Sequence, residues 1–335
     1  MSQKLRVGIL GATGMVGQRF ALLLENHPWF DVKVLAASAR SAGKKYGEVV
    51  DGRWHMEKEL PEKYKDMVVM DAQDIESVKA LVDFVFCAVN MKKDEIKALE
   101  EAYAKAEIPV VSNNSANRWT PDVPMVIPEI NAAHLEVIES QRARLGTKKG
   151  FIAVKPNCSI QSYVPALTPL LKFKPTLVVA TTYQAISGAG KTFNEWPEMI
   201  DNVIPYIGGE EEKSEKEPLR IWGEVENGEV VCAASPKITT QCIRVPVTDG
   251  HTAAVFVNFE AKPTLEDIKQ AWVDFGSPVK GLPSAPEQFV TYHDEDNRPQ
   301  AKLDRDLEGG MAVTLGRLRP DTQYDYKFVG LSHNT

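Results

Sequence analysis

Cys158 stands at a position where a thiol can act as a nucleophile. Residues 151–154 form an apolar, strand-like run, residues 156–157 form a predicted turn, and residues 159–167 follow as the start of an amphipathic helix. The sequence therefore predicts Cys158 at a helix N-terminus, where unpaired N–H groups and the helix dipole stabilise a thiolate. The alternative interpretation is an inert, buried thiol.

A thiolate nucleophile needs a group that moves protons, and His251 is the best placed of the six histidines. It follows a predicted turn at residues 248–250 and precedes a strand-like run at 252–260, so the turn would hold the imidazole at the end of a sheet. The alternative interpretation is an ordinary turn histidine.

Two arginines are candidates for binding an anion. Arg244 is a lone charge between apolar neighbours in the strand-like run 241–247. A buried charge needs a partner, so Arg244 either pairs inside the protein or binds an anionic substrate. Arg118 closes a polar loop at residues 112–118, beyond a predicted parallel strand, and such loops form the ligand crevice of parallel sheets.

A glycine-rich turn follows the first apolar run. Gly11, Gly14 and Gly17 lie between the strand-like residues 5–10 and a helix predicted from Val16. Glycines at such a turn let phosphate oxygens approach the N–H groups of a helix N-terminus. The spacing G-x-x-G-x-x-G differs from G-x-G-x-x-G, but the strand, turn and helix context favours a dinucleotide site. The alternative is a tight turn without a ligand.

The end of the second strand-like run indicates which dinucleotide would bind. An acidic residue there would accept hydrogen bonds from an unmodified ribose. Residues 36–45 contain no carboxylate, but they contain Ser38, Arg40 and two lysines. A hydroxyl and a guanidinium suit a ribose 2′-phosphate, because arginine contacts phosphate oxygens in pairs. NADP is therefore favoured over NAD.

The elements that position these residues change in character near residue 155. Before it, strand-like runs alternate with helical patterns: 5–10, 16–25, 31–37, 84–89, 93–106 and 109–112. This order predicts an α/β fold with a doubly wound parallel sheet, a Rossmann domain, over residues 1–155. Longer strand-like runs follow, with one helical pattern among them: 176–186, 239–247, 251–260, 264–275 and 311–318. They predict an α+β second domain over residues 156–329.

Several segments have ordinary structural interpretations. The charged run at residues 208–217 is typical of a solvated helix or loop, and residues 293–305 are predicted to form a polar connection. Cys87, Cys232 and Cys242 lie in apolar runs and are predicted to be small buried thiols. Because the cysteines lack zinc-site spacing, we expect no metal site.

Composition excludes several classes of function. The 335 residues carry 39 basic and 46 acidic side chains, a net charge of −7, without a basic tract that would bind nucleic acid. No apolar window reaches the length of about 18 residues that a membrane span needs. The chain opens into a strand-like run rather than a signal peptide, so we expect a cytoplasmic protein.

Five motifs occur in order along the chain, at residues 11–17, 112–115, 156–159, 184–190 and 244–251. Together they resemble the aspartate-β-semialdehyde dehydrogenase family, and residues 208–213 and 330–335 indicate its archaeal and fungal branch. The resemblance implies a Rossmann domain that binds NADP and a second, catalytic and dimerisation domain. It also implies that the chain end, residues 330–335, returns to the first domain.

The resemblance implies the reductive dephosphorylation of L-aspartyl-4-phosphate to L-aspartate 4-semialdehyde, in lysine, threonine and methionine biosynthesis. Cys158 would form a thioester, His251 would act as general acid and base, and Gln184 would orient the bound intermediate. Arg244 would hold the substrate carboxylate, and Glu210 would bind its ammonium group.

The remaining contacts of the family map onto further residues. Choosing Glu210 rather than Glu211 for the ammonium group rests on its three-residue spacing before Lys213. The other implied contacts to substrate and phosphate are Arg118, Lys213, Asn114 and Asn157. The implied contacts to the cofactor are Gly11, Thr13, Gly14, Met15, Val16, Ser38, Arg40, Ser41, Ala88, Ser187, Gly188 and Asn334.

The family also sets expectations for the chain end and for assembly. Family members continue past the segment that ends at residue 335 into a glycine- and alanine-rich helix. We therefore expect one of two things: either the sequence is trimmed, or Asn334 lies on a frayed end and the protein binds its cofactor more weakly. We expect a homodimer or homotetramer that pairs through an exposed apolar face among residues 176–185 and 255–259.

Three other functions compete with this one. A malonyl-CoA reductase or other acyl-CoA reductase would use the same thioester chemistry with a different leaving group, and an N-acetyl-glutamyl-phosphate reductase is also mechanistically related. Neither has the same need for an acidic residue opposite an ammonium group. A non-catalytic NADP-binding protein is the third alternative.

Overall fold

The computed structural model describes residues 4–335, and the chain divides into two compact units. Unit 1 contains the described residues up to Val126, Ala133–Pro156 and Val225–Val230; unit 2 contains Ile127–Ala132, Asn157–Glu224 and Val231–Thr335. The main division lies between Pro156 and Asn157. Residues 330–335 belong to unit 2, because strand β14 (Tyr326–Ser332) pairs within its sheet. The family resemblance instead predicts that this chain end returns to the first domain.

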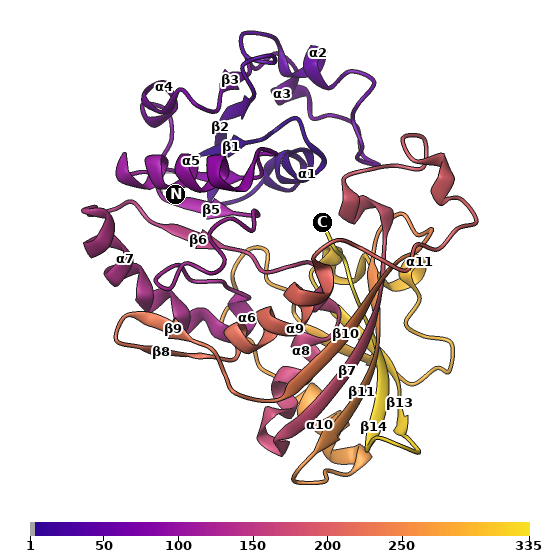
Figure 1. The fold of residues 1–335 in the computed structure, drawn as a ribbon. Helices are drawn as coiled ribbons and strands as arrows, with labels where there is room; N and C mark the ends of the chain where they lie inside the picture. The colour runs from indigo at the N-terminus through magenta and orange to yellow at the C-terminus, as the bar shows by residue number, and fades with distance from the viewer. Residues whose placement is uncertain (1–3) are drawn as a thin grey trace. The chain divides into compact units, whose positions relative to one another are not determined.

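Unit 1 is built on a six-stranded parallel sheet in the order β3-β2-β1-β4-β5-β6 (Figure 1). Its strands are β1 (Leu5–Leu10), β2 (Phe30–Ala37), β3 (Met70–Asp71), β4 (Phe84–Cys87), β5 (Val110–Ser112) and β6 (Ile152–Val154). This order confirms the predicted doubly wound sheet. The order reverses between β1 and β4, and ligands bind at the carboxyl ends of the strands beside such a reversal.

Helices cover this sheet and close an apolar core. Helix α1 (Met15–Leu24) packs on β1 and β2, and α5 (Lys93–Lys105) packs on β5 and β6, as the helical patterns predict. The core contains fully buried Val7, Ile9 and Leu35, and the rings of Phe20 and Phe86 stack beside it. The other helices of unit 1 are α2 (Tyr46–Val50), α3 (Glu62–Lys65), α4 (Ile75–Lys79) and α7 (Ile138–Leu145).

One carboxylate in unit 1 gives a pH-dependent contribution to stability. Glu107 accepts hydrogen bonds from the backbone N–H groups of Gly150, Lys149 and Lys148, which lower its pKa from 4.5 to about 2. The contribution is therefore complete above the unfolded pKa and is lost as the pH falls toward 2. We expect Glu107→Gln to have a lower free energy of unfolding than the wild type at pH 6. This difference in unfolding free energy should shrink below pH 4.5.

Chemical denaturation at several pH values measures this gap. The control is Glu76→Gln, which changes an exposed carboxylate on α4 of the same unit. A gap for Glu107→Gln that stays constant from pH 6 to pH 3 would contradict the prediction.

Unit 2 is built on a mixed sheet in the order β10-β7-β11-β14-β13-β12 (Figure 1). Besides β14, its strands are β7 (Pro175–Gln184), β10 (Lys237–Arg244), β11 (His251–Phe259), β12 (Val290–His293) and β13 (Val313–Pro320). The mixed sheet confirms the predicted α+β domain. Strands β12 and β14 were not predicted, because polar residues and Gly330 interrupt their apolar pattern.

The helices of unit 2 are mostly short. The predicted helix at 264–275 is confirmed as α10 (Leu265–Val273), with Thr264 and Asp267 forming a capping box. The other α-helices are α6 (Pro128–Asn131), α8 (Val164–Leu167), α9 (Glu210–Ile221) and α11 (Ala301–Asp304). The 3-10 helices are η1 (Ala132–Val137), η2 (Ser159–Ser162), η3 (Thr168–Phe173), η4 (Ile186–Ala189), η5 (Pro197–Met199) and η6 (Leu307–Gly310). Strands β8 (Glu224–Glu226) and β9 (Glu229–Val231) form a two-stranded hairpin. Helix η1 and this hairpin span both units.

The segment after Cys158 differs from the predicted amphipathic helix. It consists of η2, α8 and η3 in succession, with Tyr163 leaving helical geometry at φ −140°. Pro165 and Pro169 lack the N–H groups that a continuous helix would use. Cys158 therefore precedes a four-residue 3-10 helix, and the argument from a helix dipole does not apply to it.

Three further expectations were wrong in part. Cys87 and Cys242 are buried as predicted, but Cys232 is exposed because it follows the β8–β9 hairpin. The charged run at 208–217 contains the start of α9, whose Glu210 and Glu217 are buried rather than solvated. The polar connection at 293–305 contains α11.

Within residues 4–335 no helix is long and apolar enough to cross a bilayer.

Candidate active site

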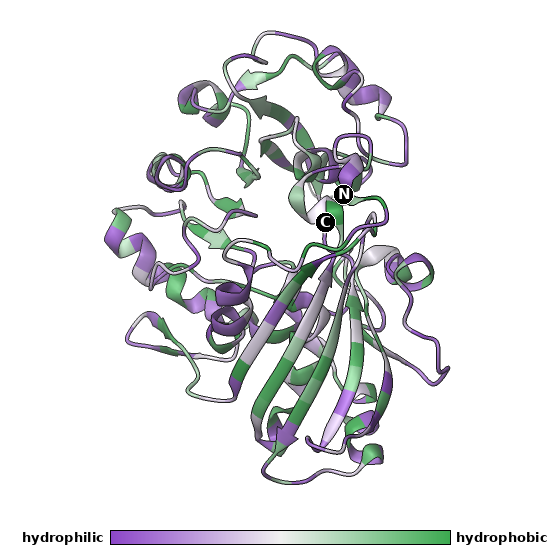
Figure 2. Ribbon diagram, turned by 45° about the vertical axis from the view of Figure 1, so that its right-hand side comes forward, coloured by the Kyte–Doolittle hydropathy of each residue, from purple (hydrophilic) through white to green (hydrophobic). Residues whose placement is uncertain are grey.

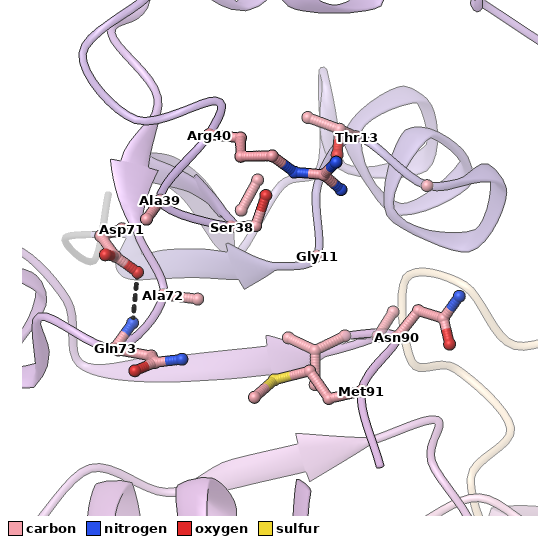
Figure 3. A pocket seen from close by; sticks show the side chains of 14 residues that line it. Gly11, Thr13, Ser38, Ala39, Arg40, Asp71, Ala72, Gln73, Asn90 and Met91 are labelled. Atoms are coloured by element: carbon pink, nitrogen blue, oxygen red, sulfur yellow. Dashed lines mark hydrogen bonds between the residues drawn. The ribbon is translucent and has the colours of Figure 1, made fainter. Parts of the chain in front are cut away.

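A cavity of about 470 Å³ opens at the carboxyl ends of four neighbouring strands of unit 1 (Figure 3). It is lined by residues that follow or end β1, β2, β3 and β4. Six residues predicted to contact the cofactor line it: Gly11, Thr13, Gly14, Ser38, Arg40 and Ala88. The lining does not include Met15, Val16 or Ser41. It adds four polar or flexible residues that the sequence interpretation missed: Asp71, Gln73, Asn90 and Met91.

The glycine turn has the geometry that a phosphate cradle needs. Gly11 has φ +84°, and a Cβ at this residue would lie 2.3 Å from the carbonyl oxygen of Ala88. Gly14 is the N-cap of α1 and offers no capping side chain to the N–H groups of its first turn. A Cβ at Gly14 would meet only the carbonyl oxygen of Gly11, at 3.7 Å, so the N–H groups are accessible and fit a dinucleotide pyrophosphate.

The second strand ends beside a free cation. Arg40 is exposed, points toward Thr13 in Figure 3, and makes no hydrogen bond or ion pair with any of residues 4–335. Lys45, in contrast, is paired with Asp66 at 2.7 Å. Asp71 ends β3, and its Oδ1 accepts the N–H of Gln73 at 3.0 Å. The residues present therefore fit a ribose 2′-phosphate on Arg40.

Arg40 is expected to set the preference between the two dinucleotides. Because a hydrogen bond to a charged group contributes about 1.5–3 kcal/mol, Arg40→Ala should weaken NADP binding by roughly 10- to 150-fold. Binding of NAD, which has no 2′-phosphate, should change little. Isothermal titration of both dinucleotides checks this, with Lys45→Ala as the control because Lys45 already pairs with Asp66. An equal loss for NAD and NADP would contradict it.

A buried carboxylate holds the polar loop after β5. Glu100 on α5 is 1% exposed and accepts hydrogen bonds from Ser112, from Asn117 at 2.7 Å and from Asn114 at 3.4 Å. Burial raises the pKa of Glu100, and these three donors partly offset the effect. Sequence patterns did not single out Glu100, because it lies in an otherwise ordinary charged helix.

Arg118 closes this loop within unit 1. Its Nε donates to the carbonyl oxygen of Lys155 at 2.9 Å, and its Nη2 donates to that of Asn113 at 3.3 Å. Arg118 and Asn114 therefore lie in one loop of unit 1. The assignment of both to phosphate binding remains a prediction.

In unit 2, Cys158 and His251 face each other. The sulfur of Cys158, which is partly exposed, lies 3.4 Å from Nε2 of His251, which is fully buried. Residue 158 reaches this position at the turn after Pro156, and residue 251 begins β11 after the turn at Gly250, where φ is +98°. The two side chains suspected from sequence are thus brought together.

The backbone of Ala185 fixes the imidazole and a guanidinium at once. Its N–H donates to Nδ1 of His251 at 3.0 Å, and its carbonyl oxygen accepts from Nη1 of Arg244 at 2.6 Å. A neutral imidazole that accepts at Nδ1 carries its proton on Nε2. Nε2 of His251 therefore donates toward the sulfur of Cys158, which stabilises a thiolate there.

Arg244 is a buried cation without an acidic partner. It is 5% exposed, and within residues 4–335 no carboxylate forms an ion pair with it. Burial lowers its pKa, which the neighbouring Cys158 and Glu210 partly offset. A Cβ built on Gly188 would lie 3.0 Å from both Arg244 Nη1 and His251 Nε2, so only glycine leaves this space open. Arg244 is placed to bind an anion beside the Cys158 and His251 pair.

Glu210 connects several predicted site residues. Its Oε1 accepts from Lys213 at 2.8 Å and from Asn157 at 3.0 Å, and its Oε2 accepts from Gln184 at 3.2 Å. Burial raises the pKa of Glu210, but the hydrogen bonds of Lys213, Gln184 and Asn157, together with the charge of Lys213, outweigh it and lower the pKa overall. A carboxylate has about four acceptor positions, so Oε2 keeps room for one more donor. Glu211 instead accepts the N–H of Cys242 on β10.

Asn334 is buried rather than frayed. It is 6% exposed, donates to Ser187 Oγ at 2.9 Å and accepts the N–H of Gly250 at 2.8 Å. It therefore ties η4, which carries Ser187 and Gly188, to the turn before His251. Of the two alternatives expected for the chain end, a frayed Asn334 is not what the structure shows, because these two hydrogen bonds hold the residue just beyond β14.

Two family models match the chain. One is described as the NAD binding domain of semialdehyde dehydrogenase and matches residues 6–138; the other is the semialdehyde dehydrogenase dimerisation domain and matches residues 167–335. An aspartate-semialdehyde dehydrogenase of Methanothermobacter thermautotrophicus is 46% identical over 98% of this chain and 94% of its own length. The chain belongs to the aspartate-semialdehyde dehydrogenase family.

Fungal members of the family are similar over the same span. The enzyme of Saccharomyces cerevisiae is 40% identical, with 100% of this chain and 94% of the relative covered. A crystal structure of the Candida albicans enzyme with NADP superposes with a TM-score of 0.87 at 40% identity, covering 99% of this chain and 94% of that one. The archaeal and fungal resemblance that the motifs predict is confirmed.

Proposed function

We propose that the protein is an NADP-dependent aspartate-semialdehyde dehydrogenase that converts L-aspartyl-4-phosphate to L-aspartate 4-semialdehyde and phosphate. The observation that carries the proposal is the constellation of Cys158, His251 and Arg244 in unit 2. The first two lie 3.4 Å apart, and the open space at Gly188 borders both His251 and Arg244. A nucleophile, a proton donor and a carboxylate-binding group thus share one place in a chain of this family.

Each step of this reaction has a group of the chain to perform it. The Cys158 thiolate attacks the carbonyl carbon of the acyl phosphate, and the carbon–oxygen bond to phosphate breaks, leaving a thioester. When the thioester is reduced, its carbonyl oxygen takes the proton of His251 Nε2 and becomes the hydroxyl of a thiohemiacetal. That proton returns to Nε2 as the carbonyl re-forms, the carbon–sulfur bond breaks, and the thiolate and the aldehyde separate. His251 is thus the group that gives up this proton and recovers it.

The substrate's amino-acid end is recognised by opposite charges. Arg244, without an acidic partner among the described residues, binds the α-carboxylate, and the remaining acceptor position of Glu210 Oε2 binds the ammonium group. Gln184, held between Thr182 and Glu210, orients the intermediate. Lys213, Arg118, Asn114 and Asn157 are proposed to contact the substrate or its phosphate.

The cofactor is proposed to be NADP. Arg40, Ser38 and the glycine turn of unit 1 would hold its phosphates. Ser187, Gly188 and Asn334 stay predicted nicotinamide contacts on the family resemblance. Bound NADPH supplies the hydride that reduces the thioester. A cytoplasmic location is the corresponding proposal for where the protein works.

The test is formation of NADPH from NADP, aspartate semialdehyde and inorganic phosphate. The proposal expects turnover that depends on phosphate. Turnover that ignores phosphate but requires coenzyme A would identify an acyl-CoA reductase. Tight binding of NADP without turnover under either condition would identify a non-catalytic binding protein.

We also propose a homodimer formed through one face of the unit 2 sheet (Figure 2). Along β7, Val179, Thr181 and Tyr183 alternate with fully buried residues and remain partly or largely exposed. On β11, Phe256 and Asn258 lie on this face and only Phe256 is apolar, whereas Val255, Val257 and Phe259 are buried inside unit 2. The matched family model is described as a dimerisation domain. Light scattering tests the proposal, and Tyr183→Lys should yield a monomer.

A further inference from the structure

One face of helix α9 contacts the turn that carries Cys158. Glu210, Ser214 and Glu217 are spaced four and three residues apart, so they lie on one side of the helix. All three are buried, with exposed fractions of 8%, 0% and 0%. A buried row of polar side chains is costly unless each member is hydrogen-bonded, so its partners indicate its purpose.

These partners are the two residues that flank Cys158. Glu217 Oε2 accepts the backbone N–H of Asn157 at 2.6 Å, and Glu210 Oε1 accepts the side-chain amide of Asn157 at 3.0 Å. The hydroxyls of Ser214 and Ser159 lie 2.7 Å apart. Asn157 Oδ1 completes the arrangement by accepting the N–H of Ser159 at 2.7 Å. The residues on both sides of the nucleophile are therefore attached to α9.

An adjacent side of α9 is attached to the sheet. Glu215 Oε1 accepts the backbone N–H of Thr240 at 2.9 Å, and Glu211 Oε1 accepts that of Cys242 at 3.3 Å. Strand β10, which holds both of these donors, ends at Arg244. Helix α9 thus connects strand β10 with the turn that carries the nucleophile.

We propose that Glu217 and Ser214 are positioning residues that hold the Cys158 sulfur opposite His251 Nε2. The inference rests on the proposed function, in which Cys158 is the nucleophile. Glu217 fixes the peptide N–H one residue before Cys158, and Ser214 fixes the hydroxyl one residue after it. Loss of either contact lets the turn shift, and a displacement of about 1 Å at a reacting group can cost about 100-fold in rate.

Three variants test the role of Glu217. Glu217→Met keeps the side-chain volume but removes the acceptor, and we expect kcat to fall about 10- to 100-fold with little change in KM for phosphate or NADP. Alkylation of Cys158 by iodoacetamide, followed by mass spectrometry, should slow in the same variant. Glu217→Gln keeps an acceptor oxygen for the Asn157 N–H and should recover most of both rates. The matched control is Glu215→Met, which removes a carboxylate contact to a backbone N–H from the same helix without touching the turn.

The outcomes separate this inference from the proposed function. Unchanged alkylation and kcat in Glu217→Met, or equal losses in Glu217→Met and Glu215→Met, overturn the positioning role. Slower alkylation in a protein that shows no phosphate-dependent turnover would overturn the proposed function and leave the positioning role intact. If Glu217→Met loses its cooperative melting transition, Ser214→Ala makes the same test at the neighbouring contact, with a smaller expected loss. Unchanged rates in that variant would overturn the inference.

Discussion

Replacing Cys158 by serine is expected to abolish phosphate-dependent formation of NADPH, with a loss of about 10⁴-fold or more. A serine hydroxyl becomes a nucleophile only when a neighbouring base removes its proton. His251 cannot serve as that base in its neutral form, because the Ala185 N–H occupies Nδ1 and places the imidazole proton on Nε2. The site therefore suits a thiolate that accepts a hydrogen bond, and it does not suit an alcohol that must lose a proton.

Initial-rate assays with aspartate semialdehyde, NADP and phosphate measure this loss. Titration with NADP accompanies them, because the affinity for the cofactor should be unchanged in a variant that alters only the nucleophile. Cys232→Ser provides the control, since Cys232 is an exposed thiol of the same chain. Activity in Cys158→Ser within tenfold of the wild type would rule out a covalent thioester on this residue.

The fold was predictable where the hydrophobic period was clear. Strand β1, helix α1 and helix α5 agree with their predicted limits within about a residue, because each has one apolar face or a continuous apolar run. The segment after Cys158 was mispredicted because apolar residues 160–167 suit a helical face, whereas two prolines divide it into short pieces. Strand β14 was missed for the opposite reason, since pairing with β11 and β13 stabilises a segment whose own pattern is weak.

The reactive side chains of the site were more predictable than the contacts that hold them in place. Cys158, His251 and Arg244 were detectable because each has an unusual side chain for its local context. The backbone of Ala185, which orients both His251 and Arg244, carries no sequence signal, since any residue supplies an N–H and a carbonyl oxygen. Glu217 was hidden in the same way, because its partner at Asn157 is a peptide N–H sixty residues away. Contacts of this kind depend on tertiary packing alone.

Replacing His251 by glutamine is expected to lower kcat by about 10²- to 10⁴-fold, the range in which general acid and base groups contribute. A glutamine amide can still donate a hydrogen bond to an oxygen or sulfur, but it cannot give up a proton and recover it. The variant therefore keeps the hydrogen-bonding part of the role and removes proton transfer. KM for phosphate should change little, because Nε2 of His251 faces the Cys158 sulfur.

Two further measurements distinguish proton transfer from a loss of structure in His251→Gln. Alkylation of Cys158 should remain faster than in Glu217→Met, because the turn of the nucleophile stays attached to α9 when only the imidazole is replaced. His27→Gln, which changes a partly exposed histidine of unit 1, should retain full activity. A His251→Gln enzyme with wild-type kcat would mean that water or another side chain protonates the substrate oxygen, and the 3.4 Å contact between His251 and Cys158 would then serve only to stabilise the thiolate.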